Sequence, residues 1–219
     1  MSKELKNRIL SSIVLIPIVF FCVIKGSFLF NFLILICFFV TSYEWHKMSG
    51  KKTYYLPGIF FLFISFYTVY QIRTNSPETD YGYFMFILLI CISTDIGGYI
   101  FGKIFKGPKL TKISPKKTFS GLLGGYLLSI LILSIYFKSS FNTFQESELT
   151  FGIFVVILLI STTSQLGDIS ISYFKRVSKI KDTGKIIPGH GGLLDRIDGM
   201  IFAFPFSYLI LKINIFQYF

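Results

Sequence analysis

The chain has 219 residues, of which 53% are hydrophobic and 19% are aromatic, whereas only 15% are charged. Soluble domains carry about 25% charged residues, so this composition excludes an ordinary soluble protein and indicates an integral membrane protein. The formal net charge is +11, and the length allows one compact membrane domain, residues 1–219, with little sequence left for a soluble one.

Hydrophobic runs predict an all-α, polytopic helical bundle, because a helix needs about 20 mostly apolar residues to cross a bilayer. Seven candidate spans lie at roughly 9–24, 27–43, 54–71, 83–101, 119–137, 150–167 and 199–216. The first run lacks a small-residue cleavage site, so we expect it to be retained as the first span. Residues 1–80 would supply the N-terminal helices and residues 81–219 a catalytic transmembrane core.

Basic residues are distributed unevenly between the predicted loops. Eighteen of the 22 Lys and Arg residues fall on one side, in the N-terminus and in the loops 44–53, 102–118 and 168–198. Since cytoplasmic loops are enriched in Lys and Arg, we expect the N-terminus and these loops to be cytoplasmic. The expected location is a cell membrane, in a bacterium the inner membrane, and the expected surface partners are membrane lipids and not nucleic acid.

Acidic side chains within or at the end of a span are costly and therefore indicate function. Asp95 lies in LLICISTDIGGYIFGK, beside glycines that fit close helix packing. The sixth span ends in STTSQLGD, and one helical face there carries Ser161, Ser164, Gln165, Asp168, Ser172 and Lys175. Hydrogen bonding between helices explains the hydroxyls and the amide but not the carboxylate. We therefore predict a functional role for Asp168, with Asp95, Ser164 and Gln165 supporting it.

One feature lies at the start of the fifth span, and another precedes it. The glycines of GLLGG, residues 121–125, predict close packing against another helix. The SPKKT segment before them presents Lys116 and Lys117, which suit a phosphate or a lipid headgroup.

The loop 168–198 combines acids, cations and glycines. Carboxylates such as those of Asp195 and Asp198 suit Mg²⁺, which typically takes one or two carboxylates plus substrate phosphates. Gly191 and Gly192 precede the last apolar run, where amides at a helix start would bind phosphate. Together these features indicate metal-assisted phosphoryl or nucleotidyl transfer between a nucleotide and a lipid phosphate.

His190 lies in the same loop and has two interpretations. It is either a general base or a residue that holds the loop or binds phosphate. A phosphate monoester has a second pKa of about 6 and is largely ionised at neutral pH, so such a nucleophile requires no strong base.

Residues 172–198, SYFKRVSKIKDTGKIIPGHGGLLDRID, resemble the signature of the phosphatidate cytidylyltransferase (CDP-diglyceride synthase) family, and we refer to them as the signature segment. SQLGD at 164–168, DIGGYIFGK at 95–103 and SPKKT at 114–118 resemble other segments of that family, in the same order. The resemblance covers residues 90–200, whereas the first three spans match only as generic hydrophobic helices.

The resemblance implies transfer of CMP from CTP to phosphatidate in phospholipid biosynthesis, giving CDP-diacylglycerol and pyrophosphate at the cytoplasmic face. It implies Mg²⁺, as one or two ions, with Asp168 and Asp195 as the main ligands and Asp198 assisting. Catalytic or substrate-binding roles would fall on Lys116, Lys117, Ser172, Lys175, Arg176, Lys181, Asp182, His190, Gly191, Gly192 and Arg196. The resemblance leaves a homodimer open.

Two positions depart from the family pattern, because Ser120 and Ile171 stand where many members have glutamate. Any role of those glutamates is therefore absent here or supplied by other residues.

Two other functions stay open at this point. A CTP-dependent polyprenol or phytol kinase would transfer the γ-phosphoryl group to a lipid alcohol and would need a base, which favours His190. A transporter would place its polar residues near the midplane of broken, paired spans. The charges cluster at one interface, and the full signature segment favours the cytidylyltransferase.

Overall fold

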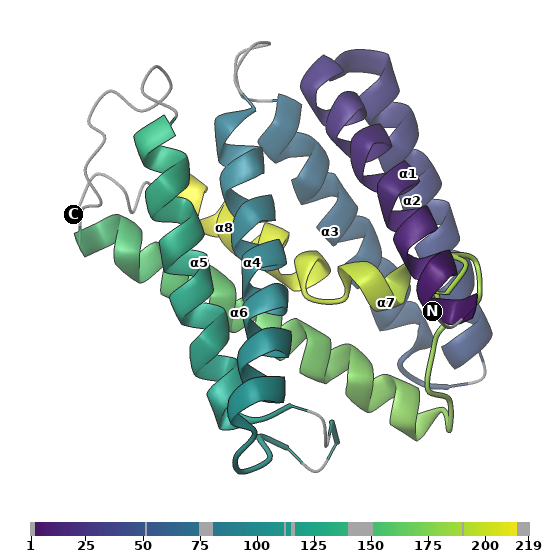
Figure 1. Ribbon diagram of the computed structural model, residues 1–219. Coiled ribbons are helices and arrows are strands. Elements are labelled where there is room, and N and C mark those ends of the chain that lie inside the picture. The colour runs from purple at the N-terminus through teal and green to yellow at the C-terminus, as the bar shows by residue number, and fades with distance from the viewer. Residues whose placement is uncertain are drawn as a thin grey trace. The chain divides into compact units, whose positions relative to one another are not determined.

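The computed structural model describes residues 3–50, 52–74, 81–111, 113–114, 117–139, 151–189 and 191–213. Within these residues the chain forms eight α-helices and no β-strand (Figure 1). The helices are α1 (Lys3–Lys25), α2 (Ser27–Ser49), α3 (Tyr55–Thr74), α4 (Gly82–Phe105), α5 (Phe119–Ser139), α6 (Phe151–Val177), α7 (Leu194–Ile197) and α8 (Met200–Lys212). The prediction of an all-α protein is confirmed for the described part of the chain.

Five of these helices are long and apolar enough to cross a membrane, namely α2, α3, α4, α5 and the apolar part of α6. The apolar parts of α1 and α8 are shorter, Ile13–Lys25 and Met200–Lys212. The count of seven spans and the cytoplasmic N-terminus stay predictions. The helices belong to two compact units, one within Met1–Tyr81 and Phe174–Asp198, the other within Gly82–Tyr173 and Gly199–Phe219.

In the first unit, α1 and α2 form a hairpin that turns at Gly26 (Figure 1). Gly26 has φ +62°, a conformation that favours glycine. The guanidinium of Arg73, from α3, lies against this turn and would be 2.6 Å from a Cβ added at Gly26. Arg73 Nε donates a hydrogen bond to the Val23 carbonyl at 3.0 Å. One buried cation thus ties the end of α3 to the last turn of α1.

An aromatic cluster packs α2 against the first residues of the signature segment in the same unit. The ring of Trp45 lies 5.3 Å from that of Phe174, and Tyr54 lies 4.8 Å from Phe174, centroid to centroid. Gly58 makes room for the indole, because an added Cβ would lie 2.0 Å from it. These contacts fix the end of α2 beside the segment that carries the predicted chemistry.

The second unit is built on close packing of α4 against α5 (Figure 1). A Cβ added at Gly97 would lie 2.3 Å from the Gly124 carbonyl oxygen, and one added at Gly124 would lie 2.2 Å from Phe101 Cβ. A Cβ at Gly121 would lie 2.7 Å from the Gly98 carbonyl oxygen. The prediction that these glycines let two helices approach closely is therefore confirmed.

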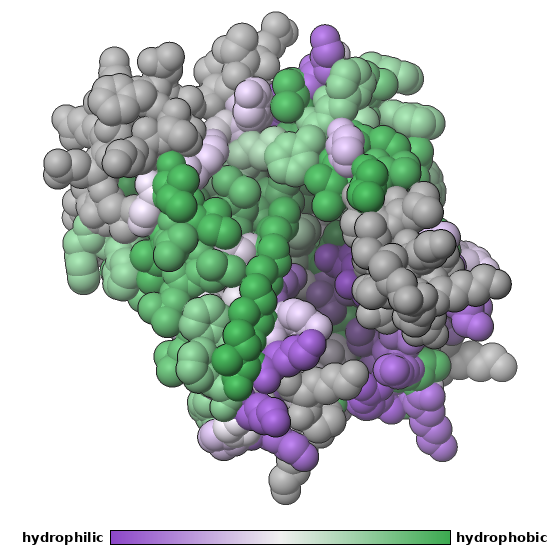
Figure 2. Space-filling view, in the orientation of Figure 1, coloured by the Kyte–Doolittle hydropathy of each residue, from purple (hydrophilic) through white to green (hydrophobic). Residues whose placement is uncertain are grey.

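The outer face of α5 is apolar. Leu123, Leu127, Leu131 and Ile135 repeat every four residues and are each more than half exposed. In Figure 2, hydrophobic side chains cover this helix, whereas hydrophilic ones gather at its foot, where the chain passes from α4 to α5. A stripe of this kind is expected of a helix that faces lipid.

Candidate functional site

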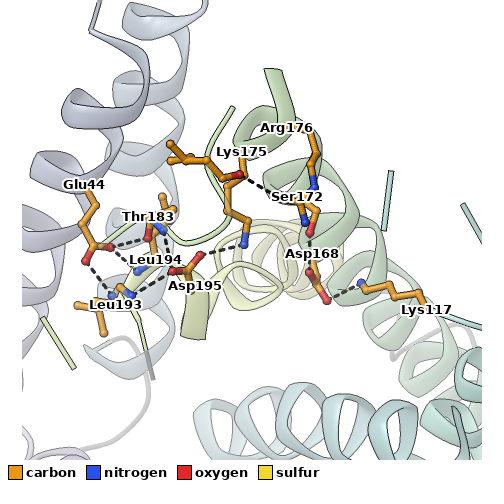
Figure 3. Close-up of polar contacts among 12 residues, drawn as sticks. Glu44, Lys117, Asp168, Ser172, Lys175, Arg176, Thr183, Leu193, Leu194 and Asp195 are labelled. Atoms are coloured by element: carbon orange, nitrogen blue, oxygen red, sulfur yellow. Dashed lines mark hydrogen bonds and ion pairs between the residues drawn. The ribbon is translucent and has the colours of Figure 1, made fainter. Parts of the chain in front are cut away.

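The signature segment folds around the carboxylate of Asp195, which belongs to the short helix α7 (Figure 3). Asp195 Oδ1 accepts a hydrogen bond from Lys175 Nζ at 2.8 Å. Asp195 Oδ2 accepts two backbone N–H groups, from Thr183 at 2.8 Å and from Gly192 at 3.0 Å. The side chains of Lys175 and Asp195 are only 10% and 6% exposed. Both residues were candidates on the sequence, and the structure joins them as a buried ion pair.

Glycine conformations give the segment the sharp turns that this arrangement needs. Gly189 and Gly191 have φ of +77° and +93°, which L side chains rarely adopt. Ile187 and Gly191 exchange two backbone hydrogen bonds, of 3.0 and 3.2 Å, and close the turn between them. A Cβ at Gly191 would lie 3.1 Å from Asp195 Oδ2 and 3.6 Å from Asp182 Cβ. Gly191 thereby lets the turn pass beside two carboxylates.

A second carboxylate, Glu44 from α2, holds the same segment (Figure 3). Glu44 Oε1 accepts the backbone N–H of Leu193 at 3.0 Å, and Oε2 accepts that of Leu194 at 2.8 Å. The Thr183 hydroxyl donates to Oε2 at 3.1 Å. The residue is 1% exposed. Sequence reasoning missed Glu44 because it assigned residues 44–53 to a loop, whereas α2 continues to Ser49.

The backbone amides that the sequence offered to a phosphate are used within the protein. The Gly191 N–H donates to Ile187, the Gly192 N–H to Asp195, and the next two amides to Glu44. The glycines also do not precede the last apolar helix directly, because α7 lies between them and α8. The amides of residues 191–194 are therefore not free for a phosphate, whereas an anion site at the start of α8 stays a prediction.

In the second unit, Lys117 forms an ion pair with Asp168 of α6 (Figure 3). Lys117 Nζ also donates to the Gln165 carbonyl at 3.4 Å, and the Ser172 hydroxyl donates to Asp168 Oδ1 at 3.3 Å. The Lys117 and Asp168 side chains are 24% and 27% exposed. This pair is therefore more accessible than the one between Lys175 and Asp195. The helical polar face predicted as far as Lys175 is confirmed, whereas the loop predicted at 168–198 is wrong at both ends, because α6 continues to Val177 and Leu194–Ile197 form α7.

The other predicted residues on the polar face of α6, and the one on α4, lie in the second unit. Ser164 is fully buried, and its hydroxyl oxygen would lie 2.4 Å from a Cβ added at Gly199. The Gln165 side-chain nitrogen is buried and has no hydrogen-bond partner among the described residues. Asp95 is exposed on α4. The backbone of Gln165 thus contacts Lys117, whereas the supporting roles of Ser164, Asp95 and the Gln165 side chain stay predictions.

The two departures from the family pattern have different surroundings in the second unit. The hydroxyl of Ser120 contacts the Lys106 carbonyl and lies 3.0 Å from the Thr118 hydroxyl, so it helps to close the connection between α4 and α5. Ile171 is 2% exposed in the apolar core. Neither position carries a group that replaces a glutamate.

Several cations of the signature segment in the first unit are exposed. Arg176 is exposed, and its Nη1 donates to the Ile180 carbonyl at 3.0 Å. Lys181, Asp182 and Arg196 are exposed as well. Lys116 and His190 lie outside the described residues. The exposed cations are accessible to a multiply charged anion, whereas Lys175 is held in place.

The three predicted metal ligands belong to different units, Asp168 to the second and Asp195 and Asp198 to the first, and their metal-binding roles stay predictions. In the described part of the chain no group of three His, Cys, Asp or Glu residues could hold a metal ion. Asp195 already accepts three hydrogen bonds, and Asp198 is buried at the end of α7. Asp168 keeps the most accessible carboxylate of the three. A partly exposed carboxylate such as that of Asp168 fits a Mg²⁺ ion that receives most of its ligands from substrate phosphates.

Comparison with known proteins covers nearly the whole chain. The model of the cytidylyltransferase family matches residues 6–78 and 52–214. A phosphatidate cytidylyltransferase of Rickettsia bellii is 37% identical over 93% of this chain and 89% of that protein. One of Rickettsia felis is 35% identical over 96% of this chain and 95% of its own length. One of Staphylococcus epidermidis is 32% identical over 86% of this chain and 69% of its own length.

These matches include the first three helices, which the signature alone left as generic hydrophobic spans. The chain therefore belongs to the cytidylyltransferase family and is a nucleotidyltransferase.

Proposed function

We propose that this protein transfers CMP from CTP to phosphatidate and so makes CDP-diacylglycerol and pyrophosphate. The names and extent of the relatives support both substrates. Long apolar helices suit an enzyme whose acceptor is a membrane lipid. The observation that carries the proposal is the cation-rich signature segment, in which Lys175 is fixed on Asp195 while further cations stay exposed.

The reaction is an in-line displacement at phosphorus. A phosphate oxygen of phosphatidate attacks the α-phosphorus of CTP, a new P–O bond forms, and the bond between the α-phosphorus and the bridging oxygen breaks. Pyrophosphate leaves with that electron pair. Because a phosphate monoester is largely ionised at neutral pH, no side chain has to remove a proton. Catalysis then depends on positioning and on neutralising negative charge.

The buried and the exposed cations suit different parts of this task. The proposal assigns Lys175 to the phosphates at the reacting centre, because its buried ion pair holds it in one place. It assigns Arg176, Lys181 and Arg196 to the triphosphate and the leaving pyrophosphate, because these exposed side chains can follow the charge. In the second unit, Lys117 would release Asp168 and bind a substrate phosphate in its place.

Residues with neutral or acidic groups take supporting roles in this proposal. Ser172, Asp182, Gly191 and Gly192 would shape the substrate-binding part of the signature segment, the glycines through their conformation and not through free amides. His190 would hold the loop or a phosphate, since the chemistry requires no base.

Mg²⁺ is the cofactor that we propose, with one ion as the minimum and a second as an extension. Asp168 would hold it together with CTP phosphates, and the ion would neutralise charge on the reacting phosphates. The proposed location of the reaction is the cytoplasmic face of a bacterial inner membrane, on the asymmetry of Lys and Arg among the loops. A homodimer is a further proposal that rests on the family resemblance.

The test is a reaction with purified protein in detergent, supplied with CTP, Mg²⁺ and either phosphatidate or a polyprenol. We expect a CMP-containing lipid with phosphatidate and no product with the polyprenol. Phosphorylation of the polyprenol without reaction of phosphatidate would overturn the proposal and favour the kinase. Mass spectrometry of the lipid extract distinguishes the two products.

A further inference from the structure

Glu44 is a buried carboxylate that the proposed reaction does not use directly. It lies near the end of α2 with 1% exposure, and its two oxygens accept three hydrogen bonds. No Lys, Arg or His of the described residues pairs with it. Burying a carboxylate is costly unless hydrogen bonds replace its hydration. Among the described residues this replacement comes from the signature segment, so the segment and Glu44 depend on one another.

The segment is shaped to admit this carboxylate. A Cβ added at Gly184 would lie 2.5 Å from Glu44 Oε1, and one added at Gly192 would lie 2.7 Å from both oxygens. Only residues without a side chain let the two stretches of backbone come this close. Glu44 thus sits in a cradle formed by the backbone on both sides of the turn.

Thr183 connects Glu44 to the cation that the proposed reaction needs. Its hydroxyl donates to Glu44, and its backbone N–H donates to Asp195. Asp195 in turn holds Lys175. The contacts form one continuous chain, from α2 through the turn to the ammonium group (Figure 3). A shift of Glu44 would therefore displace Asp195 and, with it, Lys175.

We infer that Glu44 is a positioning residue for nucleotidyl transfer, which acts by holding the turn that places Asp195 and Lys175. The inference rests on the proposed function of the signature segment. It also gives the N-terminal helices a part in the chemistry, since α2 supplies the carboxylate.

Replacing Glu44 by Gln keeps the shape of the side chain and removes one of its two hydrogen-bond acceptor oxygens. Whichever way the amide turns, its NH₂ group faces the N–H of Leu193 or of Leu194, and that N–H loses its partner. We expect kcat to fall about 10- to 100-fold, as misplacement of a catalytic group by about 1 Å does, while KM for phosphatidate changes far less. Tyr43→Phe is the matched control, because Tyr43 is the neighbouring residue of α2 and is exposed.

A double-mutant cycle with Thr183→Val separates positioning from general destabilisation. Thr183→Val removes the hydroxyl contact to Glu44 and keeps the amide contact to Asp195. If both variants act on the same link, the loss in kcat of the double variant will be smaller than the product of the single losses. Thr183→Ser keeps the hydroxyl and should recover activity relative to Thr183→Val.

The outcomes distinguish this inference from the proposed function. Absence of CMP transfer by the unaltered protein would contradict the proposed function. An active parent with an equally active, folded Glu44→Gln variant would sink the inference alone. If Glu44→Gln does not fold, Thr183→Val and Thr183→Ser decide, and equal kcat values for these two and the parent would overturn it.

Discussion

Replacing Asp195 by Asn would leave Lys175 without its counter-charge in a place where both side chains are at most 10% exposed. The Asn side chain keeps one oxygen, so its NH₂ group must face either the ammonium of Lys175 or the N–H groups of Thr183 and Gly192. Removing one partner of a buried ion pair costs about 3–5 kcal/mol. At about 2–4 °C per kcal/mol for a chain of this size, the midpoint of thermal unfolding should fall by about 6–20 °C.

The assay is thermal unfolding of the purified protein in detergent, with the Lys175→Met variant and the double variant measured beside it. The double variant lacks both charges, so it should unfold at a higher temperature than Asp195→Asn alone. An Asp195→Asn variant that unfolds at the parent's temperature would contradict this prediction. In that case the buried pair would not hold the signature segment, and a free metal-ligating carboxylate would describe Asp195 better.

Three further predictions concern the second unit and the cofactor. Lys117→Met should lower kcat/KM about 10-fold or more, because it removes a charge-assisted hydrogen bond of about 1.5–3 kcal/mol. The control Lys109→Met, at an exposed residue of the same connection, should change initial rates little. Equal rates of the two variants would contradict this prediction. Gly124→Ala should destabilise the protein, because the added Cβ would lie 2.2 Å from Phe101 Cβ, and the unfolding midpoint measures it; an unchanged midpoint would count against the close packing of α4 and α5. Chelation by EDTA should abolish CMP transfer, and added Mg²⁺ should restore it. The unfolding temperature should change little, since no cluster of the described residues could hold a metal by itself. Full activity in EDTA would contradict the proposed cofactor.

Much of the fold followed from hydropathy, because apolar runs of about 20 residues have few alternatives to a membrane helix. The ends of the helices were harder to predict. The second span was expected to end at residue 43, but α2 continues to Ser49 with Glu44 on its last turns. A polar residue whose hydrogen bonds are made inside the protein does not end a helix, and hydropathy alone cannot distinguish it from a loop residue.

The candidate site, like the fold, was predictable only in part. Asp168 was a candidate because an ionisable side chain at the end of an apolar span is costly, and Lys175 and Asp195 were candidates because they belong to the signature segment. Their partners were not, because pairing depends on how the turn folds back on itself. Glu44 was hidden for a second reason: its partners are two backbone amides and a hydroxyl about 140–150 residues away in the sequence. Backbone amides leave no trace in the residue types, so only coordinates reveal that they are already used.

Attack of phosphatidate on the α-phosphorus of CTP can be followed with CTP that carries different isotopes at its α- and γ-phosphates. The purified protein is supplied with this CTP, Mg²⁺ and phosphatidate, and the lipid and aqueous phases are counted separately. We expect the α-label to enter the lipid in an amount equal to that of the γ-label released as pyrophosphate. Recovery of the γ-label in the lipid, with the α-label left in the aqueous phase, would contradict it.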